Sequence, residues 1–293
     1  MKLKHTFDEN HNPKTTNLLF DVRDTTNHPL SLKYSEIYNA CLVNCSPSIL
    51  RSQPGLSLLD YSPFVNAIKQ VLNLQDLEGS NSLQKVEKVF YEYYETVQVK
   101  NASEWFGIDN DFLKKQPPWG AVYPWRARSI SSYRKAFEKA AIHENNAIGH
   151  QGVDINEGWL FNGPVSKRKV RIESERMLYI LKRIKKYGYQ RSNENDGDPK
   201  ATALVNENGE YRCVLTGGNH RASVASALGF TEIPIRINLV IRRDEVDFWP
   251  QVVDKIFTRS EALKVFDCYF NAEPPDFINK WVSFANKLNE NEI

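Results

Sequence analysis

The sequence contains no run of about 18 apolar residues, the length that a membrane-spanning helix requires. Its first residues, MKLKH, are basic, but Thr6, Asp8 and Glu9 follow them instead of the apolar core of a secretory signal. The formal net charge of the 293 residues is only +2, so the composition does not require a nucleic acid or a membrane surface as a partner. We therefore expect no membrane span and a cytoplasmic location, with any basic surface confined to one region.

Cysteine is also scarce, and its spacing does not suit a metal site. The chain has four cysteines, Cys41, Cys45, Cys213 and Cys268. Only the first two are close, their spacing is not that of a common zinc site, and no second pair of ligands follows. His143 and His150 lie near Asp154, but this spacing fits no strong metal-binding pattern either. We predict ordinary thiols in a reducing compartment, and we do not propose a metal site at these cysteines or histidines.

The amino-terminal part has few regular patterns. Residues 1–60 are rich in Asn, Thr, Ser and Pro, which favours loops and extended segments, with a strand at 30–34. Apolar residues at helical spacing predict helices over 62–74 and 82–97. We expect residues 1–115 to form a mostly helical and loop region, and the sequence does not indicate its role.

A segment rich in proline, residues 116–126, marks a boundary because three prolines and a glycine preclude a regular helix. It contains Trp119, Tyr123, Trp125 and Arg126. These side chains could stack on a base or sugar, or hold two parts of the fold together, and we favour the second interpretation. A helix over 131–143 and a loop over 145–166 follow.

The most informative part of the sequence surrounds two adjacent glycines. A helix is predicted over 172–187, and its acidic first turn, basic last turn and following Gly188 all suit a helix. The remaining predicted elements, in order, are a hairpin with strands at 201–205 and 211–215, the turn Gly217-Gly218-Asn219-His220-Arg221, a short helix at 222–228, Gly229, and a strand at 233–242 with alternating isoleucines.

The turn between the hairpin and the short helix has the chemistry of an anion site. Gly217 and Gly218 allow a tight bend and a close approach of the backbone to a ligand. The free N–H groups at the start of a helix favour negative charge. Arg221 adds a guanidinium that can bind phosphate oxygens in bidentate fashion, and His220 adds a titratable group. The alternative is a tight structural turn capped by Asn219.

The order of these elements over residues 170–243 resembles the ParB/sulfiredoxin superfamily. Sulfiredoxin has the sequence Gly-Gly-Cys-His-Arg at this turn, which Gly217, Gly218, His220 and Arg221 match. Asn219 replaces the nucleophilic cysteine, so reduction of a sulfinic acid is not expected. Only residues 243–293 follow, without the helix-turn-helix region of a partition protein. The resemblance is therefore to the members of the superfamily that bind ATP or CTP with magnesium, which include a free-serine kinase.

This resemblance implies an α+β fold, in which a small mixed sheet with helices lies within a largely helical amino-terminal region and a short helical carboxyl-terminal extension. The domain would span 116–245. Residues 246–293 would form helices at 245–258 and 276–288 that pack on it. The cofactor-binding residues would be Gly217, Gly218, Asn219, His220 and Arg221, together with Lys169 and Arg171 at the start of the long helix.

A phosphotransferase also needs a general base or a carboxylate for the metal. Because the superfamily packs the start of the long helix near the nucleotide, the resemblance suggests Glu173 and Glu175, with His220 as a third catalytic candidate. The two glutamates could instead provide only the negative charge that a helix favours in its first turn.

The first functional hypothesis is a Mg-dependent phosphotransferase or nucleoside triphosphatase that uses ATP or CTP, with an unidentified small-molecule or glycan-like acceptor. The alternative is a non-catalytic regulatory module that binds a nucleotide or a polyanion. Residues 165–191 contain ten Lys or Arg and two Glu, a basic run that could bind DNA or RNA or could be a solvated end of a helix. Nucleic acid is the less favoured partner.

Overall fold

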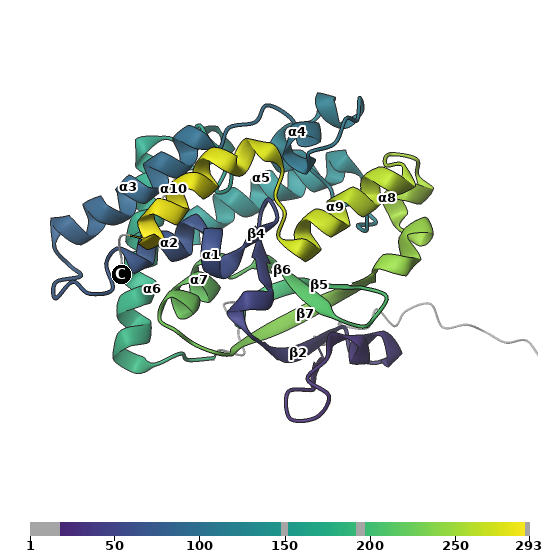
Figure 1. Cartoon of the computed structure of the whole chain (residues 1–293), viewed down its shortest axis with the longest axis horizontal. Coiled ribbons are helices and arrows are strands. Elements are labelled where there is room, and N and C mark those ends of the chain that lie inside the picture. The colour runs from purple at the N-terminus through teal and green to yellow at the C-terminus, as the bar shows by residue number, and fades with distance from the viewer. Residues whose placement is uncertain (1–17, 148–151, 192–196, 291–293) are drawn as a thin grey trace, which may run out of the picture.

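A mixed sheet of seven strands lies at the centre of the computed structural model, which describes residues 18–147, 152–191 and 197–290. The strand order is β1-β2-β7-β5-β6-β3-β4 (Figure 1). The strands are β1 (Leu19–Asp21), β2 (Ala40–Cys45), β3 (Leu50–Ser52), β4 (Leu56–Ser57), β5 (Lys200–Val205), β6 (Tyr211–Gly217) and β7 (Ile233–Arg242).

Strands from the two ends of the chain share this sheet. β5 and β6 form the expected antiparallel hairpin, and β7 lies parallel to β5 on its other side. β2 continues the sheet beyond β7, while β3 continues it beyond β6. The expected mixed sheet with helices is therefore present, but the fold is α/β, and strands from residues 19–57 enlarge the sheet on both sides.

Ten α-helices occur in the described part of the chain and pack around the sheet (Figure 1). They are α1 (Leu58–Tyr61), α2 (Pro63–Lys69), α3 (Ser80–Thr96), α4 (Ala102–Phe106), α5 (Ile130–Ala147), α6 (Lys167–Tyr187), α7 (Asn219–Ala227), α8 (Pro250–Val253), α9 (Arg259–Asn271) and α10 (Asn279–Glu290). None of the helices in these residues is long and apolar enough to cross a membrane.

Two apolar clusters hold the layers together. In one, the alternating isoleucines of β7 pack with Ala222 and Ala225, whose small side chains let α7 lie close to the sheet. In the other, Val214 of β6 belongs to a large aromatic core that includes residues of α2, α3, α9 and α10. α7 is thus held between the sheet and the helices, and the turn that precedes it is fixed from both sides.

The segment before α5 contributes to this aromatic core. Trp125 is buried and packs edge-on against Trp249 and Phe266, with ring centroids 5.5 and 6.2 Å apart. Tyr123 stacks on Trp125 at 5.0 Å. The interpretation of these aromatic residues as packing residues is therefore confirmed.

The strand expected at 30–34 is wrong. These residues belong to a 3₁₀ helix, η1 (Pro29–Tyr34), because Pro29 suits a first helical turn and the His28 ring accepts a hydrogen bond from the backbone N–H of Leu30. Leu30 and Leu32 of this segment are apolar because they pack against the apolar cluster that contains the isoleucines of β7.

The helix expected over 245–258 is also wrong in extent. Residues 243–248 form a 3₁₀ helix, and Pro250 starts the separate short helix α8. The sequence interpretation missed α9, although Thr258 and Glu261 form a capping box at its start. The last predicted helix is confirmed as α10, preceded by a 3₁₀ turn.

Candidate functional site

The two glycines of the turn differ in what the backbone requires of them. Gly218 has φ 70°, and a Cβ atom there would lie 2.9 Å from Cα of Pro199, so this position needs glycine. A Cβ atom at Gly217 would lie 3.7 Å from Cβ of Lys200, an ordinary contact. The fold therefore requires Gly218, whereas Gly217 leaves an open position at the end of β6.

The start of α7 is open to a ligand. The first backbone hydrogen bond runs from the N–H of Ala222 to the carbonyl of Gly218 at 3.0 Å, and no side chain of the described residues caps the helix. Three N–H groups, those of residues 219–221, precede that bond, and such groups attract negative charge. Thr216 and Gly218 are exposed beside them. Asn219 was considered as a cap, but its Oδ1 atom has no hydrogen-bond partner in the described structure.

Arg221 holds the loop between α6 and β5 against the turn. Its Nη1 atom donates a hydrogen bond to the carbonyl of Gly197 at 2.8 Å. The hydroxyl of Tyr189 lies close enough to Arg221 to be affected by its charge. Burial raises the pKa of this hydroxyl, and the charge of Arg221 opposes that rise. One nitrogen of the guanidinium is thus engaged with the backbone, and Arg221 both shapes the site and contributes positive charge to it.

His220 points away from the solvent. Its ring packs edge-on against Phe64 of α2, with centroids 5.2 Å apart, and its Nε2 atom lies 2.8 Å from Oε2 of Glu173, although in poor alignment for a hydrogen bond. Both side chains are buried. The turn is therefore attached to α6 through a contact between a histidine and a carboxylate.

Glu173 lies at the centre of a buried group of charges. Lys169 Nζ is 2.5 Å from one of its oxygens and Arg176 Nη1 is 3.0 Å from the other. Burial would raise the pKa of Glu173, but the contact with His220 and the charges of His220, Lys169 and Arg176 outweigh it and lower the pKa well below its usual range. The carboxylate stays ionised because three cationic or titratable groups surround it.

Two of the expected site residues lie elsewhere. Arg171 donates to Glu175 at 2.7 Å and to Glu87 of α3 at 3.3 Å. Arg171 and Glu175 are about half a helical turn away from Glu173, so they follow a different face of α6. The structure thus brings together the turn, Lys169 and Glu173, and it does not bring Arg171 or Glu175 to them.

Two cations that the sequence interpretation did not single out lie beside the turn. Lys200 of β5 pairs with Gly217 in the sheet register, and it also pairs with Arg236 of β7. The charged side chains of Lys200 and Arg236 lie on the face of the sheet opposite the alternating isoleucines of β7. The alternation in β7 placed Arg236 on that face, but only the strand pairing shows that it lies next to Lys200.

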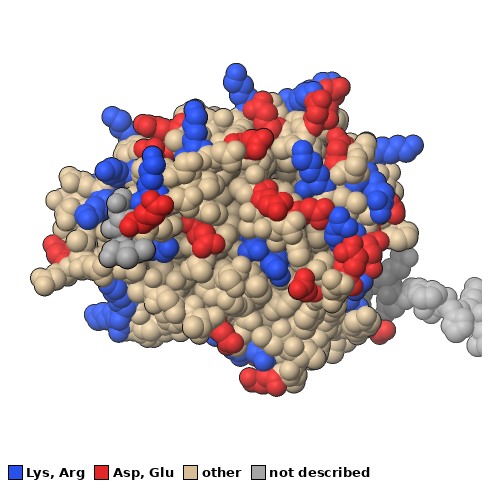
Figure 2. All heavy atoms as spheres, viewed as in Figure 1, with Lys and Arg blue, Asp and Glu red and all other residues tan. Residues whose placement is uncertain are grey.

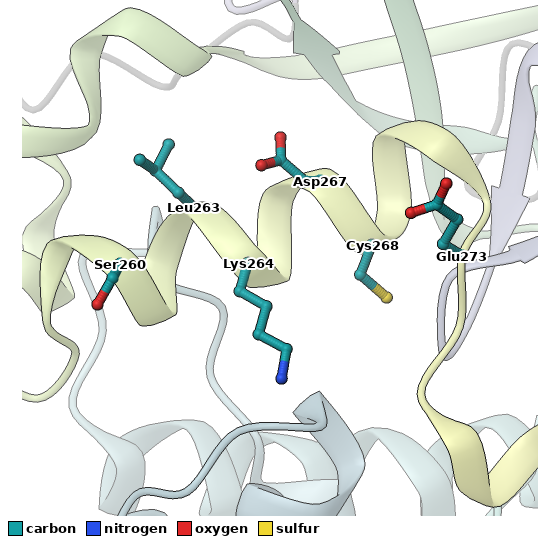
Figure 3. Close-up of a pocket in the computed structure, with 6 residues that line it drawn as sticks. All are labelled: Ser260, Leu263, Lys264, Asp267, Cys268 and Glu273. Carbon is teal, nitrogen blue, oxygen red and sulfur yellow. The ribbon is translucent and has the colours of Figure 1, made fainter.

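Two broad hollows on the surface of the described residues lie away from the turn. One of about 470 Å³ lies along α9, where Lys264 and Cys268 extend to the same side of the helix (Figure 3). Its polar groups are engaged, because Lys264 donates to the carbonyl of Gly107 at 2.6 Å and Asp267 pairs with Arg243 at 2.7 Å. The other, of about 570 Å³, lies along α6 at Tyr179, Arg183, Tyr187 and Gln190.

No group of three or more His, Cys, Asp and Glu side chains suited to a metal occurs within residues 18–147, 152–191 and 197–290. Asp154 instead accepts a hydrogen bond from the N–H of Asn156 at the start of a short 3₁₀ helix. His150, one of the residues considered above, lies outside the described residues.

Comparisons with known proteins do not identify the chain: no protein-family model, no curated protein and no solved structure matches it. The site must therefore be interpreted from its own geometry.

Proposed function

We propose that this protein binds a nucleoside triphosphate, ATP or CTP, through its phosphates at the turn formed by residues 217–221. The observation that supports this most directly is the uncapped start of α7, where three backbone N–H groups follow an open glycine position and adjoin Arg221. The ionised carboxylate nearest this turn, Glu173, is buried and surrounded by cations. A phosphate at the turn would meet donors and positive charge.

The order of elements supports the resemblance to the ParB/sulfiredoxin superfamily as the source of this chemistry. α6, the β5–β6 hairpin, the glycine turn, α7 and β7 follow one another as the resemblance implies. The added strands β1 to β4 would then be an elaboration of that module, and the helix α2 that follows them encloses His220 through Phe64.

The described residues suit phosphate better than they suit magnesium. Glu173 is wholly buried, and Asp198, a described carboxylate on the adjoining loop, forms two bonds with Arg191 at 2.9 and 2.8 Å. Magnesium commonly reaches a site with the phosphates of its nucleotide and keeps several waters. We therefore propose neither Glu173 nor Asp198 as a magnesium ligand.

Calorimetry and thermal shift with ATP, CTP and GTP, each with and without Mg²⁺, test this proposal. Gly217→Val fills the open position without a forbidden backbone angle, and Arg221→Ala removes the adjacent charge. We expect both variants to lose nucleotide binding while Arg259→Ala, an exposed arginine at the far end of the chain, retains it. Binding by wild type that neither Gly217→Val nor Arg221→Ala weakens would place the nucleotide elsewhere.

Transfer or hydrolysis of the terminal phosphate is the catalytic form of this proposal. The contact between His220 and Glu173 favours it, because a carboxylate beside an imidazole can hold the ring in position for proton transfer. The matched test is His220→Asn, for which we expect nucleotide binding to remain and release of phosphate, or its transfer to a small-molecule or glycan-like acceptor, to be lost. Nucleotide binding without turnover by wild type would instead support the regulatory module.

Binding of a polyanion through residues 165–191 is the second candidate. One observation favours it: the exposed Tyr179 and Tyr187 flank Arg183 along α6, an arrangement on which bases could stack. However, many cations of this run are engaged, for example Lys182 with Glu78 and Lys185 with the carbonyl of Leu72. Figure 2 also shows acidic groups interspersed with basic ones over one face of the molecule. Titration of a labelled oligonucleotide at several salt concentrations measures this activity directly.

A further inference from the structure

Three positions lie side by side across the sheet next to the glycine turn. In the strand register, Arg236 of β7 pairs with Lys200 of β5, and Lys200 pairs with Gly217 of β6. Paired residues of neighbouring strands point to the same face, and strands are about 4.8 Å apart. The row therefore consists of two cations followed by a position without a side chain, directly before the start of α7.

This arrangement is unfavourable in the absence of a ligand, because like charges on neighbouring strands repel each other. None of the carboxylates in the described residues forms an ion pair with Lys200 or Arg236. Other arginines of the same region are neutralised: Arg242 forms two bonds with Asp244 at 3.0 and 2.7 Å, and Arg191 forms two with Asp198. Within the part of the chain that the structure describes, carboxylates thus lie beside these arginines but form no ion pair with Lys200 or Arg236.

A third cation lies on the same face of β5. Thr202, two residues after Lys200, accepts a hydrogen bond from Nη2 of Arg126 at 3.0 Å. Burial lowers the pKa of Arg126, and the charge of Arg128 adds to this effect. Cations gathered on one face of a strand repel each other, and local conflicts of this kind are typical of functional sites.

We infer that Lys200 and Arg236 form a second phosphate subsite, so that the phosphate chain of the ligand runs from the start of α7 on one face of the sheet, past Gly217 at the end of β6, to these two cations on the other face. This inference rests on the proposed function and makes it more specific. A monophosphate would occupy only the start of α7, whereas a diphosphate or triphosphate would also reach Lys200 and Arg236. The phosphate chain would pass over Gly217, where there is no side chain to block it. A Cβ atom added to Gly217 would lie 3.7 Å from Cβ and 3.8 Å from Cδ of Lys200.

Calorimetry with AMP, ADP, ATP and inorganic tripolyphosphate on wild type, Lys200→Met and Arg236→Met tests the inference. We expect wild-type affinity to increase along the nucleotide series. Each substitution should weaken ATP and tripolyphosphate binding about tenfold, which is typical for loss of one charge-assisted contact, and leave AMP binding unchanged. Arg242→Met, on the same strand but paired with Asp244, is the matched control and should bind ATP as wild type does.

The melting temperature of the ligand-free variants distinguishes a role of Lys200 and Arg236 in binding from a role in stabilising the fold. Removing one of two repelling charges should leave the melting temperature unchanged or raise it, whereas loss of a structural contact would lower it. Equal weakening of AMP and ATP, or ATP binding unaffected by both substitutions, would overturn the second subsite and leave the turn as the nucleotide site. Failure of wild type to bind any of the four ligands would overturn the proposed function and the subsite together.

Discussion

The Nε2 atom of His220 lies 2.8 Å from Oε2 of Glu173, so a residue of the glycine turn contacts the carboxylate on α6 that Lys169 and Arg176 also contact. The contact is wholly enclosed, and Phe64 of α2 covers the other side of the ring. Glu173 therefore fixes the position of the turn relative to the long helix, whatever its part in any reaction.

Glu173→Ala should strongly destabilise the protein. Removing the carboxylate takes away the buried anion that Lys169, Arg176 and His220 all contact, and loss of one partner of a buried ion pair costs about 3–5 kcal/mol. Urea unfolding measures the change. Glu175→Ala, two residues further on and exposed, is the matched control and should change the free energy of unfolding by less than about 0.5 kcal/mol. Similar values for the two variants would show that the buried charges are not coupled as described.

Stability should fall with acid in a way that depends on Glu173. Its pKa is lowered in the folded protein from an ordinary value of 4.5, so the unfolded chain binds more protons than the folded one below that value. The contribution of Glu173 is therefore fully present above pH 4.5 and is lost as the pH falls further. Denaturant unfolding between pH 3 and 6 should show a steeper decline for wild type than for Glu173→Gln. Parallel curves would contradict the assignment.

Much of the module around the turn could be predicted from the sequence because its signals are local. The hairpin, α7 and β7 follow from turn residues and from the alternation of isoleucines, and the structure confirms them within a few residues. The strands β1 to β4 could not be predicted in the same way. They have six residues or fewer. β2 and β3 gain their place from partners about 150 or more residues away in the sequence, as in the pairing of Leu50 with Cys213, and β1 and β4 pair in turn with β2 and β3.

In the candidate site, too, some features follow from local sequence signals and others depend on tertiary contacts. The glycines and Arg221 were identified from an order of residues along the chain. The separation of Glu173 from Glu175, in contrast, depends on which face of α6 meets α7, and the neighbourhood of Lys200 and Arg236 depends on the register of three strands. Both are tertiary relationships that a local pattern does not specify.

The two glycines of the turn should respond differently to substitution. Gly218→Ala forces a side chain into a left-handed conformation and against the backbone of Pro199, and should cost about 1–3 kcal/mol. Gly217→Ala meets only ordinary contacts, so its melting temperature should stay near that of wild type. Thermal unfolding of the two variants in parallel provides the comparison, and a Gly218→Ala variant as stable as wild type would show that the turn adopts another conformation.

The cysteines should be unreactive in the folded protein. Burial raises the pKa of Cys41 and Cys268 to about 12, and Cys213 is also buried with a raised pKa. Cys45 lies 3.6 Å from Cys213, sulfur to sulfur, in the same apolar cluster. Titration with a thiol reagent at pH 8 should detect little reaction until denaturant is added, and four thiols afterwards. Rapid reaction of more than one thiol of the native protein would mean that this cluster opens in solution, because only Cys268 is half-buried and lines a surface hollow.

The carboxyl-terminal helix should be necessary for the stability of the whole protein. Trp281 of α10 is fully buried, donates a hydrogen bond from Nε1 to the carbonyl of Tyr61 at 2.7 Å, and packs edge-on against Tyr93 of α3 at 5.1 Å. Trp281→Ala should therefore cost about 3–5 kcal/mol, the usual loss for removing a large buried aromatic side chain.

Phe248→Ala is the matched control for this prediction, because Phe248 is 80% exposed although it belongs to the same carboxyl-terminal extension. It should leave the melting temperature nearly unchanged. A single unfolding transition that Trp281→Ala shifts as a whole would show that residues 246–293 fold together with the amino-terminal helices. A variant in which only a minor early transition moves would show instead that α10 is a separable extension, because the rest of the core would then be stable without the contacts of Trp281 with Tyr61 and Tyr93.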